Sequence, residues 1–128
     1  MALRIVRLGT PRLPDEGLRI GTVRHPPRGV RKEDFAERDF YDVWYPELSP
    51  TSALVKQALA AETDQAWTVF VRAFRKEMAT PAARHALELV AALSHRTDLS
   101  IGCYCENEAR CHRSVLRELL ADDGAQLT

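Results

Sequence analysis

The chain has 128 residues, of which 45% are hydrophobic, so it can form one compact domain with its own core. Its 18 basic and 18 acidic side chains give a formal net charge of zero, so the total charge indicates no polyanionic or polycationic partner. No run of about 18 apolar residues is present, and Arg4 and Arg7 interrupt the start of the sequence, where a secretory signal is apolar. We therefore expect no membrane span and a cytoplasmic location.

The charge is distributed unevenly along the chain. Residues 1–32 contain eight basic and two acidic side chains, a formal excess of +6, so the remaining residues carry −6. A basic face of this kind suggests, as one alternative, a module that binds nucleic acid or another protein. Residues 1–32 contain no Phe, Trp or Tyr to stack on bases, and runs of charge are usually solvated surface. The nucleic-acid alternative therefore ranks second.

The first half of the sequence alternates between short strand patterns and proline-containing loops. Residues 3–8 and 18–23 are apolar and β-branched, and residues 40–45 are aromatic and β-branched, so we predict three strands. Prolines in residues 9–17 and 25–29 indicate loops, because proline cannot continue a strand ladder.

The second half changes to a helical period. Thr51 or Ser52 is placed to cap a helix, and Thr80-Pro81 is a typical helix start. Between them, one aromatic helical stripe is expected to be core; it consists of Trp67, Phe70, Val71, Phe74 and Met78. Residues 99–105 alternate as a strand, and a last helix follows that ends near Gly124, with residues 123–128 expected to fray. The predicted fold is one α/β domain over residues 1–128, with a mixed or mostly parallel sheet of about four strands covered by about four helices.

The segment that is best placed for chemistry runs from Cys103 to Arg113, where a predicted strand passes through a loop into a predicted helix. Ligands of open α/β sheets usually bind at the carboxyl edge of the strands, and a helix start favours anions and thiolates. We therefore expect Cys111 to be a nucleophile, with Cys105 as another candidate, and His112 to be an acid or base. Arg113 and Arg110 are expected to bind the ligand.

A second loop is predicted to reach the same edge. Arg24 and Arg28 follow the strand of residues 18–23, so they converge on the cysteine loop if the two strands are parallel neighbours. Arginine offers a planar fork that suits phosphate or carboxylate. The function expected from these residues is binding of, or action on, a small anionic ligand.

Two other interpretations remain open for the cysteines. In the first, Cys105, Cys111 and His112 bind Zn²⁺ or iron, since thiolate and imidazole are the ligand types that such ions prefer. Two features argue against a metal: Cys103 and Cys105 have the spacing of strand neighbours, and adjacent residues on a helix diverge by about 100°. In the second, the cysteines are only packed, and Cys103 in particular is expected to be a core strand residue.

The sequence resembles the bacterial domain-of-unknown-function family 488 from about Leu18 to Leu120. Three blocks carry the resemblance: Arg24-His25-Pro26-Pro27-Arg28-Gly29-Val30; Pro46 to Leu54 with the aromatic helix; and Cys103 with Cys111-His112-Arg113. Pro26 replaces the family's usual Trp, and a Glu is expected at or beside Cys105, a place for which Glu106 is the candidate. The resemblance implies a small α/β fold and no established activity.

Overall fold

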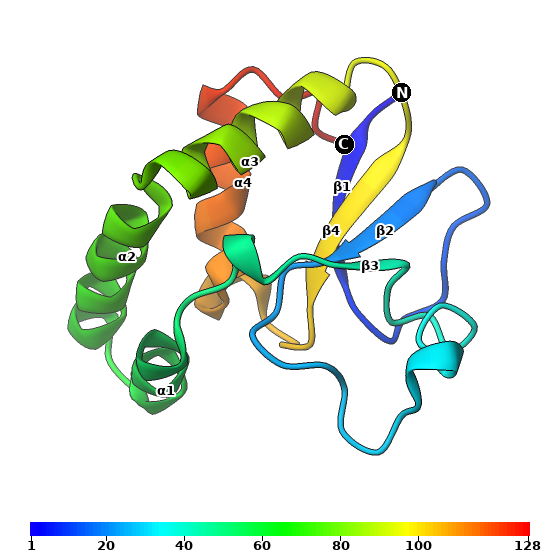
Figure 1. The fold of residues 1–128 in the computed structure, drawn as a ribbon. Coiled ribbons are helices and arrows are strands. Elements are labelled where there is room, and N and C mark those ends of the chain that lie inside the picture. Colours follow the sequence, from blue (N-terminus) through cyan, green and yellow to red (C-terminus); the bar gives the residue numbers. More distant parts are fainter.

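The computed structural model describes residues 1–128 and shows a single sheet of four parallel strands (Figure 1). The strands lie in the order β1-β4-β2-β3. Their bounds are Leu3–Arg7 for β1, Leu18–Gly21 for β2, Val43–Trp44 for β3 and Leu99–Cys103 for β4. The predicted α/β class is confirmed. The central strand β4 is buried along its whole length, because both of its edges are paired and both of its faces are covered.

Four helices lie together against one face of the sheet (Figure 1). They are α1 (Ser52–Ala60), α2 (Asp64–Met78), α3 (Pro81–Leu93) and α4 (His112–Asp122). Thr80 and Pro81 begin α3 as predicted, whereas the Thr63 side chain caps α2 by accepting from the backbone N–H of Ala66. None of these helices combines the length and the apolar composition that crossing a bilayer requires.

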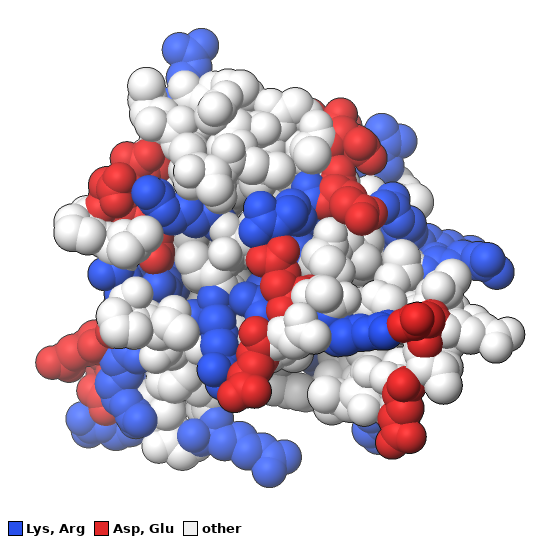
Figure 2. All heavy atoms as spheres, turned by 180° about the vertical axis from the view of Figure 1, so that it is seen from behind, with Lys and Arg blue, Asp and Glu red and all other residues white.

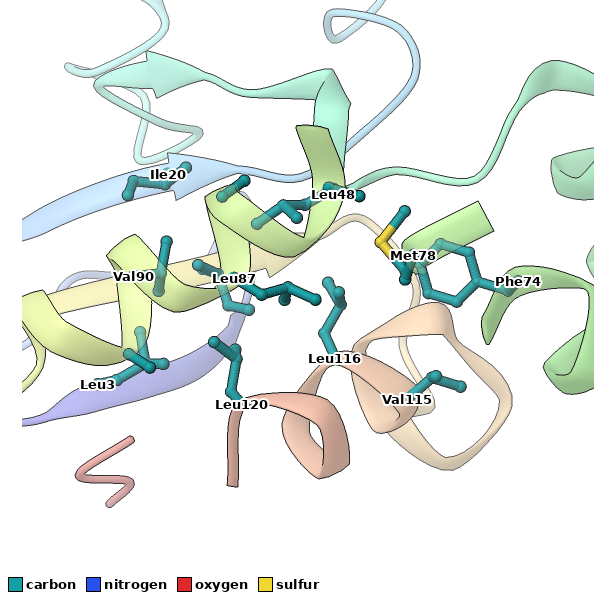
Figure 3. Packing of buried hydrophobic residues seen from close by; sticks show 14 of the residues in the cluster. Leu3, Ile20, Leu48, Phe74, Met78, Leu87, Val90, Val115, Leu116 and Leu120 are labelled. Atoms are coloured by element: carbon teal, nitrogen blue, oxygen red, sulfur yellow. The ribbon is translucent and has the colours of Figure 1, made fainter. Parts of the chain in front are cut away.

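The main hydrophobic core lies between this helical layer and the sheet (Figure 3). The aromatic stripe of α2 supplies Phe70, Phe74 and Met78, which are all buried as expected. They contact apolar side chains of the other helices and of the strands. These side chains include Leu3, Ile20, Leu87, Val90, Leu116 and Leu120. Each of these side chains contributes about 1.5–3 kcal/mol by leaving water, so the apolar period that predicted the helices also places the core.

The opposite face of the sheet carries a buried ion pair beside a small apolar cluster that includes Leu8 and Tyr41. Arg19 on β2 is fully buried and donates to both carboxylate oxygens of Glu16, at 2.7 and 2.8 Å. The same guanidinium donates to the backbone carbonyls of Thr10 and Asp39, and Ser100 on β4 donates to Glu16. Because these hydrogen bonds tie the sheet to residues 9–17 and to residue 39, the loops are held over a face that has no helix to cover it.

Two segments differ from the sequence-based expectations. The third strand was expected over residues 40–45, but only Val43 and Trp44 pair with β2. Tyr41 instead turns its ring against Gly21, where a Cβ atom would lie 2.3 Å from the ring, and Asp39 before it has a φ of 62°. The end of the chain was expected to fray, yet residues 126–128 are hydrogen-bonded to Leu3 of β1.

The ion pair on the loop-covered face predicts an acid-sensitive contribution to stability. Burial alone raises the pKa of Glu16, but the Arg19 and Ser100 hydrogen bonds outweigh burial and lower it below its ordinary value of 4.5. The Glu16 carboxylate therefore stabilises the fold above that pH, and its contribution is lost as the pH falls through the lowered pKa. Glu16→Gln leaves Arg19 buried without a charge partner, so we expect a loss of about 3–5 kcal/mol in the free energy of unfolding at neutral pH.

Urea unfolding of both proteins at several pH values checks this expectation. The difference between wild type and Glu16→Gln should shrink as the pH is lowered. Glu33→Gln, at an exposed residue with no ion pair, is the matched control and should change little. A difference that stays constant from neutral to strongly acidic pH contradicts the assignment.

Candidate functional site

The carboxyl ends of β2 and β4 lie side by side, because the two strands are parallel neighbours with Gly21 opposite Gly102. The loops that follow them therefore leave the sheet at one edge, as the sequence predicted. Both loops line one pocket of about 520 Å³, which residues 23–28 and 103–105 share with α1, α2 and the start of α4. This pocket contains most of the residues that were singled out from the sequence.

The walls of the pocket are mainly apolar. Val55, Ala58 and Leu59 of α1 form one side, and Phe70 of α2 lies next to them. Other lining residues are Val23, Pro26, Pro27, Phe40 and Tyr104. Of these helical residues, Phe70 was expected to be core only. The exposed position of Leu59, at 76%, is a signal that the apolar face of α1 is not fully packed.

The deep end of the pocket is formed by Cys103, Cys111 and His112, which we call the Cys-His cluster. All three residues are buried, and their sulfur and ring nitrogen atoms lie within 4.8 Å of one another. Cys103 is the last residue of β4. It packs in a small apolar cluster, as expected of a core residue, and it also lines the pocket. Cys105 is half-buried, with its Sγ 3.8 Å from the Cys103 Sγ.

Cys111 and His112 can face the same point because only His112 belongs to the helix. Cys111 is the residue before α4 and has an extended backbone, with φ −127° and ψ 151°. Its Sγ lies 3.8 Å from the His112 Nδ1. The expected divergence of about 100° between adjacent helical residues therefore does not apply, and that objection to a shared ligand was wrong.

His112 is held in place by two contacts on its far side. Its Nε2 lies 2.6 Å from the carbonyl oxygen of Thr22, and the ring of Phe74 packs against it edge to face at 5.6 Å. A carbonyl oxygen can only accept, so Nε2 carries the proton and donates. In the neutral ring this leaves the lone pair of Nδ1 directed toward Cys111.

Arg113 does not reach the pocket. It is 3% exposed, and its guanidinium donates to the Cys111 Sγ at 3.4 Å and to the Cys105 carbonyl oxygen at 2.6 Å. The predicted role in binding a ligand therefore has no direct geometric basis. Arg113 instead fixes the cysteine loop and places a positive charge beside the Cys111 sulfur, which favours the thiolate.

The close packing of the thiols shifts their pKa values in opposite directions. The contact with Cys105, then the contact with Cys111 and burial, raise the pKa of Cys103 far above its ordinary value. The same contact with Cys103 lowers the pKa of Cys105, and the nearby Arg113 charge adds to that effect. Cys103 also lowers the pKa of Cys111. The geometry agrees with these directions, because the Cys103 thiol is the donor in its contact with the Cys105 sulfur.

The other three arginines predicted to bind the ligand have different environments. Arg24 lines the pocket, but its guanidinium donates to the backbone carbonyls of Pro46, Ser49 and Pro50. Arg110 pairs with Asp64 and lies over the Trp67 ring. Arg28 lines the pocket, is exposed, and has no hydrogen-bond or ion-pair partner. Of the three, Arg28 is the cation that remains available to a ligand.

About half of the basic excess of residues 1–32 is neutralised by acidic residues elsewhere in the chain, because Arg7, Arg12 and Arg31 pair with carboxylates outside the segment. Arg4 and Arg19 pair with the two acidic residues of the segment itself. Figure 2 shows one face of the molecule, where basic and acidic side chains are interspersed without a continuous basic surface. This distribution gives no support to the nucleic-acid alternative.

The chain belongs to the domain-of-unknown-function family 488. A family model described as "Active DUF488-N3 subclade" matches residues 3–124, which include the whole sheet, all four helices and the Cys-His cluster. No curated protein and no solved structure matched the chain. The resemblance that was based on the Arg-Gly and Cys-His-Arg blocks is confirmed.

The environments of Arg24 and Arg28 predict a large loss of stability for substitution of the first and a small one for the second. Arg24→Ala removes the donor for three carbonyl oxygens, so we expect the free energy of unfolding to fall by about 2–3 kcal/mol. Arg28→Ala removes no contact within the protein and should cost less than about 0.5 kcal/mol. Urea unfolding of the two variants measures both values. Equal losses in the free energy of unfolding would contradict the assignment of Arg24 as a bonded and Arg28 as an unpartnered side chain.

Proposed function

We propose that this member of the DUF488-N3 subclade binds a small ligand with an apolar body and an anionic group, and that Cys111 and His112 supply the groups that react with it. The observation that carries the proposal is the composition of the pocket from rim to deep end. An unpartnered arginine lies at its rim, apolar side chains form its walls, and the Cys-His cluster closes it. The family description, which names an active subclade, supports a chemical role.

The apolar body is inferred from the walls. Ligand pockets in proteins usually have volumes of about 300–1,000 Å³ and mostly apolar linings, with a few polar groups that fix orientation. The pocket described above, at about 520 Å³, falls in that range and has this kind of lining. A ligand that buries an apolar body against Val55, Ala58 and Leu59 gains about 25 cal/mol for each Å² of apolar surface removed from water.

The anionic group is inferred from Arg28. Its guanidinium is free to form two parallel hydrogen bonds with a phosphate or a carboxylate. Arg24 stiffens the segment from which Arg28 projects, because it is bonded to the turn at residues 46–50. The anion is therefore expected at the rim, while the rest of the ligand points toward Cys111 and His112.

The deep end of the pocket provides the reacting groups. The His112 ring is oriented by Thr22, and its Nδ1 faces the Cys111 sulfur at 3.8 Å. A sulfur and a basic nitrogen at this separation, with the nitrogen oriented by a third group, form the arrangement that activates a thiol or binds an electrophile. Arg113 holds Cys111 from the side away from the pocket, so its role in this proposal is to position the sulfur.

Phenyl phosphate is a suitable probe because it combines an aromatic body with a phosphate. We expect it to bind to the wild type more tightly than inorganic phosphate, which lacks the apolar body, and more tightly than phenol, which lacks the charge. Arg28→Ala should weaken phenyl phosphate binding by about tenfold, which corresponds to roughly 1.4 kcal/mol. Titration followed by protein NMR measures the three affinities and assigns the residues that respond.

Arg31→Ala is the matched control, because Arg31 lies three residues away but pairs with Asp34 and does not line the pocket. This variant should bind phenyl phosphate as the wild type does. The proposal fails if both variants weaken binding equally, or if the resonances that respond lie outside the pocket.

The alkylation rate of Cys105 gives an independent measure of the electrostatic potential in the pocket. It lines the same pocket as Arg28 and is half-buried, so small alkylating reagents reach it. Iodoacetate is anionic and iodoacetamide is neutral; the ratio of their alkylation rates at Cys105 should be higher in the folded protein than in the unfolded chain. Arg28→Ala should lower this ratio by about two- to fivefold, and Arg31→Ala should leave it unchanged.

Peptide mapping by mass spectrometry after timed labelling measures the ratio at Cys105 alone. A ratio that is the same in the wild type and in Arg28→Ala removes Arg28 as the source of anion selectivity.

A further inference from the structure

The Cys-His cluster has the dimensions of a coordination site. A tetrahedral zinc ion with Zn–S distances of about 2.3 Å and Zn–N distances of about 2.0 Å places its ligand atoms roughly 3.5–3.8 Å apart. Cys111 Sγ and His112 Nδ1 are 3.8 Å apart, and the cluster as a whole lies within 4.8 Å. Its widest edge therefore needs to contract by no more than about 1 Å to reach this geometry.

The three ligand atoms come from rigid parts of the fold. Cys103 ends the fully buried strand β4, and His112 is the first residue of α4. Cys111, between them in the chain, has the extended backbone that brings its sulfur to the same side as the His112 Nδ1. Because Cys103 and His112 belong to a strand and a helix, and Cys111 is buried and contacted by Arg113, little conformational entropy is lost when the three bind one ion.

The contacts around the cluster are those that surround metal ligands. A histidine that binds a metal usually donates its other N–H to a carbonyl or carboxylate, which fixes the ring and the tautomer. The Nε2 of His112 makes this hydrogen bond to Thr22 and leaves Nδ1 as the ligand atom. Arg113 donates to the Cys111 sulfur, and such a hydrogen bond stabilises a metal-bound thiolate.

The ligand chemistry selects the ion. Two thiolates and one imidazole favour Zn²⁺ over Mg²⁺ or Ca²⁺, which prefer oxygen ligands, and no carboxylate belongs to the cluster. The two thiolate charges neutralise a divalent ion inside a site that is otherwise buried. Only Arg113 adds a nearby charge, and it lies against Cys111 on the side away from the pocket.

We propose that Cys103, Cys111 and His112 bind one Zn²⁺ ion whose fourth coordination position faces the pocket. This assignment differs from the set expected from the sequence, in which Cys105 took the place of Cys103. The Cys105 sulfur is close to Cys103 but does not belong to the compact group of ligand atoms. When the ion is bound, Cys111 and His112 are its ligands and are no longer a free thiol and base, so the deep end of the pocket then acts through the fourth position. The three-ligand site stands independently, whereas the use of its fourth position by a bound ligand rests on the proposed function.

The first experiment compares single serine variants. Zinc content is measured by elemental analysis after purification without chelator and equilibration with Zn²⁺. We expect one ion per chain in the wild type and in Cys105→Ser, and at least a tenfold weaker Zn²⁺ affinity in Cys103→Ser and Cys111→Ser. Equal weakening in Cys105→Ser would indicate four protein ligands and would overturn the open fourth position.

The second experiment needs no variant, so it remains decisive if a serine substitution prevents folding. Co²⁺ added to the wild type should give the intense visible absorption of a tetrahedral ion together with a thiolate-to-cobalt charge-transfer band. Zn²⁺ should displace it at a ratio of one ion per chain and should raise the melting temperature. Absence of both bands, together with zinc content well below one ion per chain, overturns the site.

The third experiment separates the two proposals. Phenyl phosphate should shift the visible bands of the cobalt-loaded wild type, because its ring, held by Arg28 through the phosphate, fills the part of the pocket that the fourth position faces and changes the access of solvent to it. Arg28→Ala should keep the full cobalt spectrum while it loses the shift. A spectrum that phenyl phosphate does not alter overturns the use of the fourth position. If Arg28→Ala binds phenyl phosphate as the wild type does, the proposed function fails while the metal site stands.

Discussion

The parallel pairing of β2 with β4 is the constraint on which the site depends. It sets the end of β2 beside the end of β4, with Gly21 opposite Gly102, so Thr22 comes next to Cys103, the last residue of β4. The Thr22 backbone N–H donates to Gly102, and its carbonyl accepts from His112. One residue thus extends the sheet and orients the imidazole, which makes the geometry of the site a direct result of strand register.

A sheet of four strands with helices on one face leaves its other face to be covered by loops. The Glu16–Arg19 pair provides this cover, since its hydrogen bonds reach β4, residue 10 and residue 39. A buried ion pair adds little to stability compared with an apolar core of the same volume, but breaking it is costly. The ion pair therefore specifies the arrangement of the loops at residues 9–17 and at residue 39.

Local patterns were sufficient to predict most of the fold. The period of the aromatic stripe gave α2, Thr80-Pro81 gave the start of α3, and β-branched runs gave β1 and β2, because each pattern reports a face that must be buried. The convergence of the two loops also followed from the sequence, since it required only that the strands be parallel neighbours. Tyr41 was misplaced because an aromatic residue is favoured equally in a strand and in a packed loop.

The details of the site depended on backbone angles and partners that no local pattern reports. The Cys111 sulfur can approach His112 only because Cys111 lies outside α4. The first residue of a helix can shift by one position without any change in the apolar pattern of the sequence, so the pattern could not show this. Arg24 and Arg113 have the same side chain as Arg28, yet carbonyl oxygens of other segments accept hydrogen bonds from the first two.

The late position of β4 in the chain has a kinetic consequence. Leu99 of β4 pairs with Leu3 and Leu18, so the sheet closes only after some 80 to 95 intervening residues have been brought together. Such long-range pairing slows folding, so the helices are expected to form before the sheet does and the pocket to be completed last.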